Sequence, residues 1–91
     1  MYEEEIPNEW FCPITQELLI DPVIAADGYT YERKSLESWF KKSHMSPVTG
    51  LVLNETKVIP NYAIKHTIEQ YLEKQKKSGL PIPSKKINYN P

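Results

Sequence analysis

The side chains best suited to metal binding or nucleophilic chemistry are sparse in this chain. Its 91 residues contain one cysteine, Cys12, and two histidines, His44 and His66. A structural zinc site takes four ligands, nearly always cysteine or histidine. These side chains fall one ligand short of a single tetrahedral site, so the sequence predicts a domain that folds without metal and needs no cofactor.

Cys12 is also the only thiol that could act as a nucleophile. A reactive thiol needs a neighbouring base or cation, and the neighbours Phe11 and Pro13 supply neither. A single cysteine cannot form an internal disulfide, which excludes a small secreted fold held by disulfides. We therefore expect a reducing compartment, and we keep covalent catalysis by Cys12 only as an alternative.

Two clusters combine proline with apolar side chains, as small rigid contact surfaces do. Pro13 precedes Ile14, and a loop stiffened by proline can present such a side chain at little cost in entropy. Trp39 precedes the second cluster, Ser46-Pro47, and tryptophan is seldom fully buried and is enriched in binding sites. For Ile14 and Trp39 the pattern leaves two interpretations open, a core position or a contact with a partner.

Short β-favouring runs and turn signals surround these clusters. Residues 23–25 and 29–31 flank Asp27-Gly28, which predicts a β-hairpin. Residues 51–53 follow another turn and predict a third short strand. The predicted sheet is therefore small and has three short strands.

Two helices should pack on this sheet. Glu32 can cap the first helix, which runs up to Lys41-Lys42, and Asn61 can cap the second, which stops at Gly79. Their apolar stripes are Leu36, Trp39 and Phe40 in the first, and Ile64, Ile68, Tyr71 and Leu72 in the second. The fold class is therefore α+β, a small sheet with a central and a C-terminal helix.

Charge and composition exclude several partners. The net charge of -1 argues against nucleic acid, and no apolar run approaches the roughly 18 residues that a membrane span requires. The acidic start has the wrong polarity for a signal peptide. We expect a lead-in over residues 1–6, a domain over 7–77 and a linker or tail over 78–91.

Beyond these general patterns, the order and spacing of several strings resemble the U-box family over about residues 7–73. The strings are Phe11-Cys12-Pro13-Ile14, Asp21-Pro22-Val23, Asp27-Gly28-Tyr29-Thr30-Tyr31-Glu32-Arg33, Trp39, Ser46-Pro47-Val48-Thr49 and Ile59-Pro60-Asn61. The resemblance implies a RING-like fold without zinc, in which hydrogen bonds and ion pairs replace the metal sites. Residues assigned to that polar network are Asp21, Tyr31, Glu32 and Arg33. Ordinary turn and cap roles remain the alternative for them.

The resemblance also implies a ubiquitin ligase module that docks a ubiquitin-charged conjugating enzyme and promotes transfer to a substrate lysine without a covalent intermediate. The implied docking residues are Ile14, Gln16, Trp39, Pro47, Thr49 and Gly50. Gln16 stands where many ligases have a second apolar residue. Gly50 stands where several active members have a basic or amide side chain that bridges enzyme and ubiquitin; Asn54 or Lys57 could substitute for it.

Other regions would recruit the substrate, and a homodimer is left open. The location implied is the cytoplasm or nucleus, or the host cytosol if the source is a microbe. The alternative from another class is an interaction or dimerisation module of the same fold that does not promote transfer.

Overall fold

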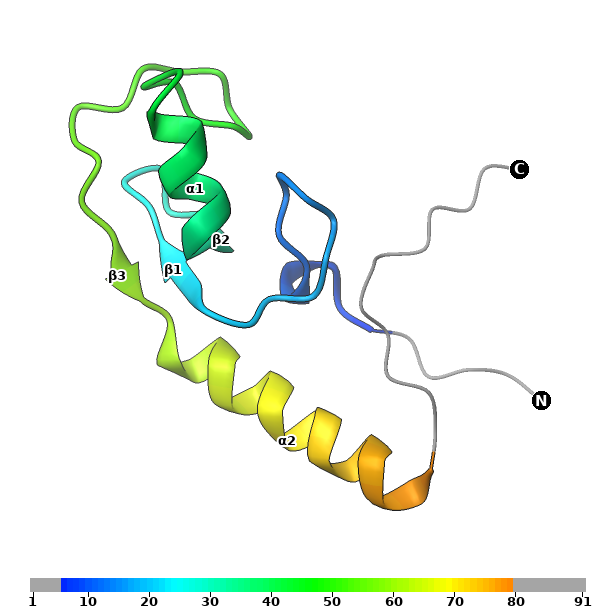
Figure 1. Ribbon diagram of the computed structural model, residues 1–91. Coiled ribbons are helices and arrows are strands. Elements are labelled where there is room, and N and C mark those ends of the chain that lie inside the picture. Colours follow the sequence, from blue (N-terminus) through cyan, green and yellow to red (C-terminus); the bar gives the residue numbers. More distant parts are fainter. Residues whose placement is uncertain (1–5, 80–91) are drawn as a thin grey trace, which may run out of the picture.

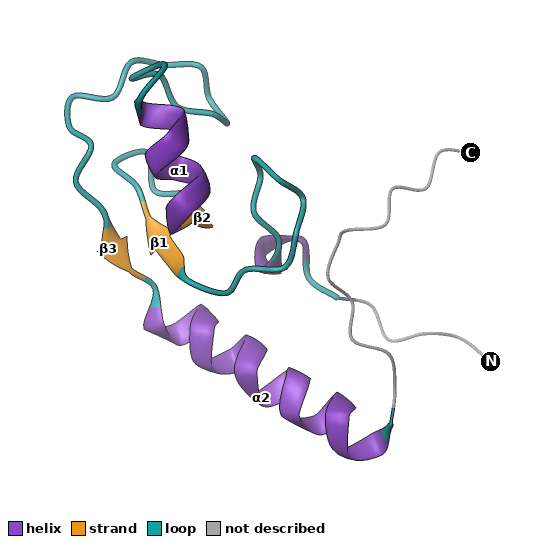
Figure 2. Ribbon diagram, viewed as in Figure 1, coloured by secondary structure: helices purple, strands orange, loops and turns teal. Residues whose placement is uncertain are grey.

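The computed structural model describes residues 6–79, which form a small sheet and two α-helices (Figures 1 and 2). This confirms the α+β class. In chain order the elements are the 3-10 turn η1 (Asn8–Trp10), β1 (Pro22–Ile24), β2 (Thr30–Glu32), α1 (Arg33–Phe40), β3 (Ile59–Pro60) and α2 (Tyr62–Ser78). Apart from Ile6, Ser78 and Gly79, the expected lead-in (1–6) and tail (78–91) lie outside the described residues.

The predicted hairpin is confirmed, with β1 and β2 antiparallel and Val23 opposite Tyr31. Its loop is closed by two backbone bonds, from the Ala25 N–H to the Tyr29 carbonyl at 3.0 Å and from the Gly28 N–H to the Ala25 carbonyl at 2.9 Å. Gly28 has a φ of 85°, the left-handed conformation that such a three-residue hairpin loop requires at this position. The Asp-Gly signal thus predicts the turn, but the loop has three residues, 26–28, and not the two that this signal indicates.

The third strand is not where the sequence predicts it. β3 pairs antiparallel with β1, placing Ile59 opposite Ile24, so the strand order is β2-β1-β3. The prediction of a strand at residues 51–53 is wrong, because Val52 makes a single bridge to Met45 and lies outside the sheet. Leu51 and Val52 are 70% and 71% exposed, so the segment lacks the buried contacts that would stabilise it as a strand of the sheet. β3 tolerates proline because it is a sheet edge.

The core lies where both helices meet the sheet. α1 contacts β2, and α2 contacts β1. Leu36 of α1 and Ile68 of α2 are each 1% exposed, and both belong to one buried cluster. The other members of that cluster are Phe11, Cys12, Leu18, Leu19, Val23, Ala25 and Tyr31. Both ends of the segment that precedes the sheet, residues 11–12 and 18–19, therefore fold onto the core.

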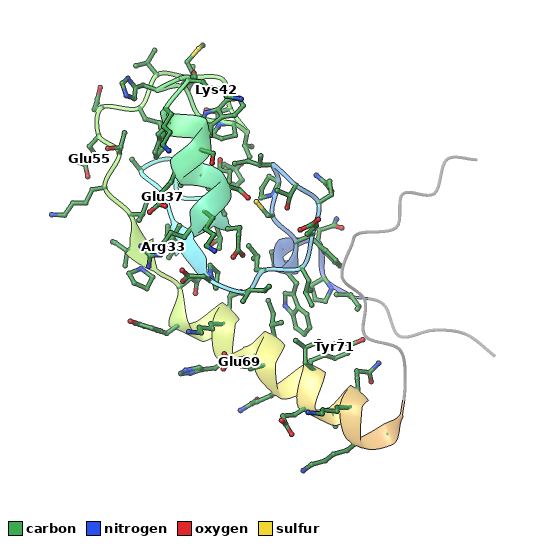
Figure 3. All side chains as sticks on the ribbon, in the orientation of Figure 1. Arg33, Glu37, Lys42, Glu55, Glu69 and Tyr71 are labelled. Atoms are coloured by element: carbon green, nitrogen blue, oxygen red, sulfur yellow. The ribbon has the colours of Figure 1, made fainter. Side chains whose placement is uncertain are left out.

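α2 begins as predicted at the cap residue Asn61, whose side-chain oxygen accepts from the Ile64 N–H at 3.1 Å. The same side chain donates to the Thr30 hydroxyl at 3.1 Å, which ties the helix start to β2. Further along, Tyr71 points from α2 toward the N-terminal turn (Figure 3), where its ring meets Trp10 edge-on at 5.4 Å. The helix ends at Gly79, which has a left-handed φ of 71°.

Asn61→Ala should lower the free energy of unfolding by about 1–2 kcal/mol, because it removes a helix cap together with the bond to Thr30. Chemical denaturation measures this loss. Asn61→Asp keeps the cap acceptor and loses only the amide donor, so its loss should be smaller. Equal losses in the two variants would contradict the cap assignment.

Candidate functional site

Loop 1, residues 12–17, is a tight turn held at both ends. The Cys12 N–H donates to the Glu17 carbonyl at 2.9 Å, and the Gln16 N–H donates to the Cys12 carbonyl at 2.7 Å. Just outside the loop, Phe11 and Leu18 form a β-bridge, and both are core residues. Buried side chains thus anchor the stems of loop 1, while its tip is left for contact.

The apolar residue at the tip of loop 1 is Ile14, which is partly buried and packs against the core cluster. Its side chain therefore touches the core and also keeps part of its surface exposed, and its contact with a partner stays a prediction. Gln16 is exposed, has a φ of 63°, and donates from its side-chain amide to the Pro13 carbonyl at 3.1 Å.

Loop 2, residues 44–53, is organised around Ser46, which is 2% exposed. The Ser46 hydroxyl accepts from the N–H groups of Val48 at 3.1 Å and Thr49 at 2.9 Å. Its backbone N–H donates to the Leu51 carbonyl at 2.7 Å, and its carbonyl accepts from the Gly50 N–H at 3.0 Å. One buried serine therefore fixes the backbone of the segment that contains Pro47.

The remaining predicted contact residues lie on loop 2 or beside it. Pro47 is partly buried, whereas Thr49 and Gly50 are exposed. Gly50 has a φ of 76°, and no heavy atom lies within 4 Å of the position that a Cβ would take. Trp39, in the last turn of α1, is partly buried and donates from its indole N–H to the Met45 carbonyl at 2.7 Å. Trp39 thus joins the helix to loop 2.

A carboxylate links loop 2 to the hairpin. One oxygen of Asp27 accepts from the Ser46 hydroxyl at 2.6 Å and from the Tyr31 hydroxyl at 2.7 Å. The other oxygen accepts from the Tyr29 N–H at 2.9 Å. Burial, and then the bond to Asp27, raise the pKa of Tyr31, so its hydroxyl stays protonated and donating at neutral pH.

A second polar group fastens the segment between loop 1 and β1. The carboxylate of Glu32 accepts from the N–H groups of Ile20 at 2.8 Å and Asp21 at 3.2 Å. Glu32 occupies the N-cap position of α1 but makes no side-chain cap bond, so the capping prediction is wrong: the carboxylate is turned toward these two amides instead.

The neighbouring ion pair joins Arg33 to Asp21, with Nε and Oδ2 2.8 Å apart and side chains 35% and 47% exposed. At that exposure the pair adds little stability, and its main effect is to orient the start of α1. The four residues assigned to the polar network therefore fall into two groups. Tyr31 belongs to the group around Asp27, and Asp21, Glu32 and Arg33 form the other.

The two loops, the hairpin turn and the N-terminal segment with Asn8, Glu9 and Phe11 line one open groove of about 440 Å³. Loop 1 supplies Pro13 and Gln16 to its lining, loop 2 supplies Val48, and the hairpin supplies residues 28–30. In Figure 1 the tips of both loops lie on one side of α1, which carries Arg33 at its sheet end and Lys42 beyond its other end (Figure 3). Of the six predicted contact residues, Gln16 lines this groove, whereas the other five do not: Ile14, Trp39, Pro47, Thr49 and Gly50.

Sequence patterns missed the role of two side chains that each make three hydrogen bonds, Asp27 and Ser46. The sequence places Asp27 in a turn and Ser46 in a proline cluster, and it predicts no such bonds for either. The available signal was local, since Asp27 and Ser46 both accept from the N–H two residues on, as short turn side chains do. Nothing local predicts that their side chains bond to each other.

Within residues 6–79, no group of three or more cysteine, histidine, aspartate or glutamate side chains is arranged to hold a metal ion. Cys12 is fully buried, and its sulfur accepts from the Glu32 N–H at 3.3 Å. None of the helices in the described part of the chain is long and apolar enough to cross a membrane.

Comparison with known proteins supplies the family. The model of the U-box domain matches residues 6–77. Over 73 residues, the chain is 49% identical to the human WD repeat, SAM and U-box domain-containing protein 1, a match that covers 79% of this chain and 15% of that protein. Over 76 residues, it is 38% identical to U-box domain-containing protein 34 of Arabidopsis thaliana, covering 84% of this chain and 10% of the relative.

The chain therefore spans only a small part of the length of these relatives. Proteins with this domain are usually ubiquitin ligases, and in this family the domain generally binds a conjugating enzyme. The matched range includes both loops, the sheet, α1 and nearly all of α2. On this evidence the chain belongs to the U-box family.

Proposed function

We propose that the domain docks a ubiquitin-charged conjugating enzyme on loop 1, α1 and loop 2, and promotes transfer of ubiquitin to a lysine. No covalent intermediate forms on the domain. Ile14, Trp39 and Pro47 supply the apolar contacts, and Gln16, Thr49 and Gly50 border them. Because the chain is a small part of its relatives, the substrate is bound by regions outside it.

The observation that carries this proposal is the combination of partly exposed apolar side chains with backbone that is already fixed. Ile14 and Pro47 are partly buried, and each lies in a loop closed by its own hydrogen bonds. Trp39 is also partly buried and is bonded to loop 2 through the Met45 carbonyl. Docking on such a surface loses little conformational entropy, so a small contact area is enough for useful affinity.

The chemical step takes place on the partner. Ubiquitin joined by a thioester to a conjugating enzyme is a flexible donor, and restraining it near the attacking amine removes entropy from the barrier. The domain therefore needs no nucleophile and no general base of its own. Its contribution is orientation.

Two measurements test the proposal. The first is binding of the purified domain to a panel of conjugating enzymes. The second is the rate at which a charged conjugating enzyme discharges ubiquitin onto free lysine, with and without the domain. Binding together with faster discharge supports ligase activity, and binding to no member of the panel contradicts the docking proposal.

Gly50→Arg should accelerate discharge about tenfold, because it returns a cationic side chain to the position that several active ligases use to bridge enzyme and ubiquitin. No heavy atom lies within 4 Å of the position that the new Cβ would take. The left-handed φ of 76° should cost about 1–2 kcal/mol of stability. Single-turnover discharge at saturating domain measures the gain.

Gly50→Ala is the matched control, since it carries the same backbone cost without the side chain. Equal discharge rates for the arginine and alanine variants would show that the bridging position does not limit this domain. In that case Asn54 and Lys57, which are exposed in the following segment, become the next residues to test.

One observation favours a second candidate, an interaction module that binds its partner without promoting transfer. Gly50 has no side chain with which to restrain ubiquitin, although loop 2 is otherwise well ordered around Ser46. The two candidates separate in the discharge assay, where the interaction module binds a conjugating enzyme but leaves its discharge rate unchanged.

The covalent alternative gains nothing from the geometry. Cys12 has no exposed surface, and its sulfur is engaged by the Glu32 N–H, so a thioester could not reach it without opening loop 1. Its neighbours Phe11 and Pro13 offer no base. A Cys12→Ser domain that folds should therefore still promote discharge.

A further inference from the structure

Gln16 is the one non-glycine residue with a positive φ among residues 6–79, at 63°. This conformation is sterically unfavourable for residues with a Cβ, whereas glycine and, less fully, asparagine adopt it more readily. The conformation is needed because Gln16 follows a single helical turn, closed by the 2.7 Å bond from its N–H to the Cys12 carbonyl. The chain must then reverse so that Glu17 can pair with Cys12.

The side chain of Gln16 is folded back onto its own loop. Its amide nitrogen donates to the Pro13 carbonyl at 3.1 Å, which lies at the start of the same turn. Backbone and side-chain bonds of one residue therefore close both sides of the segment that presents Ile14. An amide used in this way has one donor hydrogen fewer to offer a partner.

We infer that Gln16 is a positioning residue, which acts on partner docking by keeping loop 1 closed around Ile14 and not through its own contact with the partner. This inference rests on the proposed function, because it concerns the same docking surface. It predicts that the backbone preference of the residue at position 16 matters more than its size or polarity.

The energetic reason is the population of the closed loop. For a partner that binds only the closed form, the apparent affinity is the intrinsic affinity multiplied by the fraction of molecules in that form. β-Branched side chains tolerate the left-handed conformation least, so Gln16→Val should open the loop in many molecules. Gln16→Gly adopts the conformation freely, and Gln16→Asn adopts it with little penalty.

The test compares Gln16→Gly, Gln16→Asn and Gln16→Val in the whole chain, with Glu17→Val as a neighbouring β-branched control at an ordinary φ. Affinity for the best conjugating enzyme of the panel is measured by calorimetry, and exchange of the residue-16 amide is followed by NMR in the free protein. The glycine and asparagine variants should bind about tenfold more tightly than Gln16→Val. The amide at position 16 should exchange about tenfold faster in Gln16→Val than in Gln16→Asn.

The discharge assay adds a kinetic signature. A partner that binds only the closed loop draws the open form back to the closed form, so saturating charged enzyme occupies all of the domain. Gln16→Val should therefore raise the KM for the charged enzyme and leave kcat as it is. Tighter binding by Gln16→Gly than by Gln16→Val would exclude loss of a side-chain contact as the cause of the weaker binding.

Direct contact predicts the opposite order. If the side chain touches the partner, glycine removes all of it and valine only part, so a glycine variant that binds more weakly than Gln16→Val overturns the inference. A loss of affinity in Glu17→Val equal to that in Gln16→Val overturns the inference as well. If the unaltered domain binds no conjugating enzyme at all, the proposed function fails, and this inference fails with it.

Discussion

Ile14→Ala is expected to weaken binding of a conjugating enzyme about 30-fold, which is the effect of truncating a residue at the centre of an apolar contact. Ubiquitin discharge at limiting domain should fall in proportion. The reason is that Ile14 lies at the tip of loop 1, partly exposed, on a backbone that the Cys12 and Gln16 bonds already fix. Calorimetry against the best enzyme of the panel measures the loss.

The same substitution should leave the fold in place. Ile14 packs against the core cluster but is only partly buried, so removing its outer carbons should cost roughly 1 kcal/mol of stability. Ile20→Ala is the matched control, because Ile20 is 77% exposed, lies outside both loops and undergoes the same chemical change. Comparable losses of affinity in the two variants, or undiminished discharge by Ile14→Ala, would contradict docking on loop 1.

The elements that the sequence predicted correctly are those with local signals. Asp27-Gly28 between two β-favouring runs specifies the hairpin because its turn geometry needs only neighbouring residues. Asn61 and Gly79 bound α2 for the same reason, since a cap bonds within one turn of its helix. Each of these signals is complete within a few residues of sequence.

Contacts between distant segments were harder to predict. β3 has only two residues and contains a proline, so its pattern is that of a helix lead-in, and only β1 makes it a strand. Glu32 has the position of a cap, yet its carboxylate bonds amides 11 and 12 residues earlier in the chain. In both cases tertiary pairing decided between two locally acceptable arrangements.

The proposed docking surface shows the same division. The residue types of Ile14 and Trp39 left a core position and a partner contact both open, and the resemblance to the U-box family implied the contact role for these two residues and Pro47. How those loops are held was not readable from the sequence, since Ser46 and Asp27 are 19 residues apart and bond through their side chains. The proposed contact residues could thus be named from the sequence, whereas the residues that support their loops could not.

Ser46→Ala should be the most destabilising single change in loop 2, lowering the free energy of unfolding by about 2–3 kcal/mol. Without the hydroxyl, the N–H groups of Val48 and Thr49 lose their acceptor, and the Asp27 carboxylate loses a donor. In a domain of this size the midpoint of thermal unfolding should fall by about 10–20 °C. Affinity for a conjugating enzyme should also fall, because Pro47 lies between the bonded residues.

Two further variants separate support of loop 2 from a general loss of stability. Asp27→Asn would place an amide donor against either the Tyr31 and Ser46 hydroxyls or the Tyr29 N–H, depending on how the amide is turned. Either arrangement loses acceptors, so it should weaken binding as Ser46→Ala does. Ser78→Ala, an exposed serine at the end of α2, should change neither stability nor affinity. If Ser46→Ala binds the enzyme normally at a temperature where it is folded, loop 2 does not need its buried serine to dock a partner.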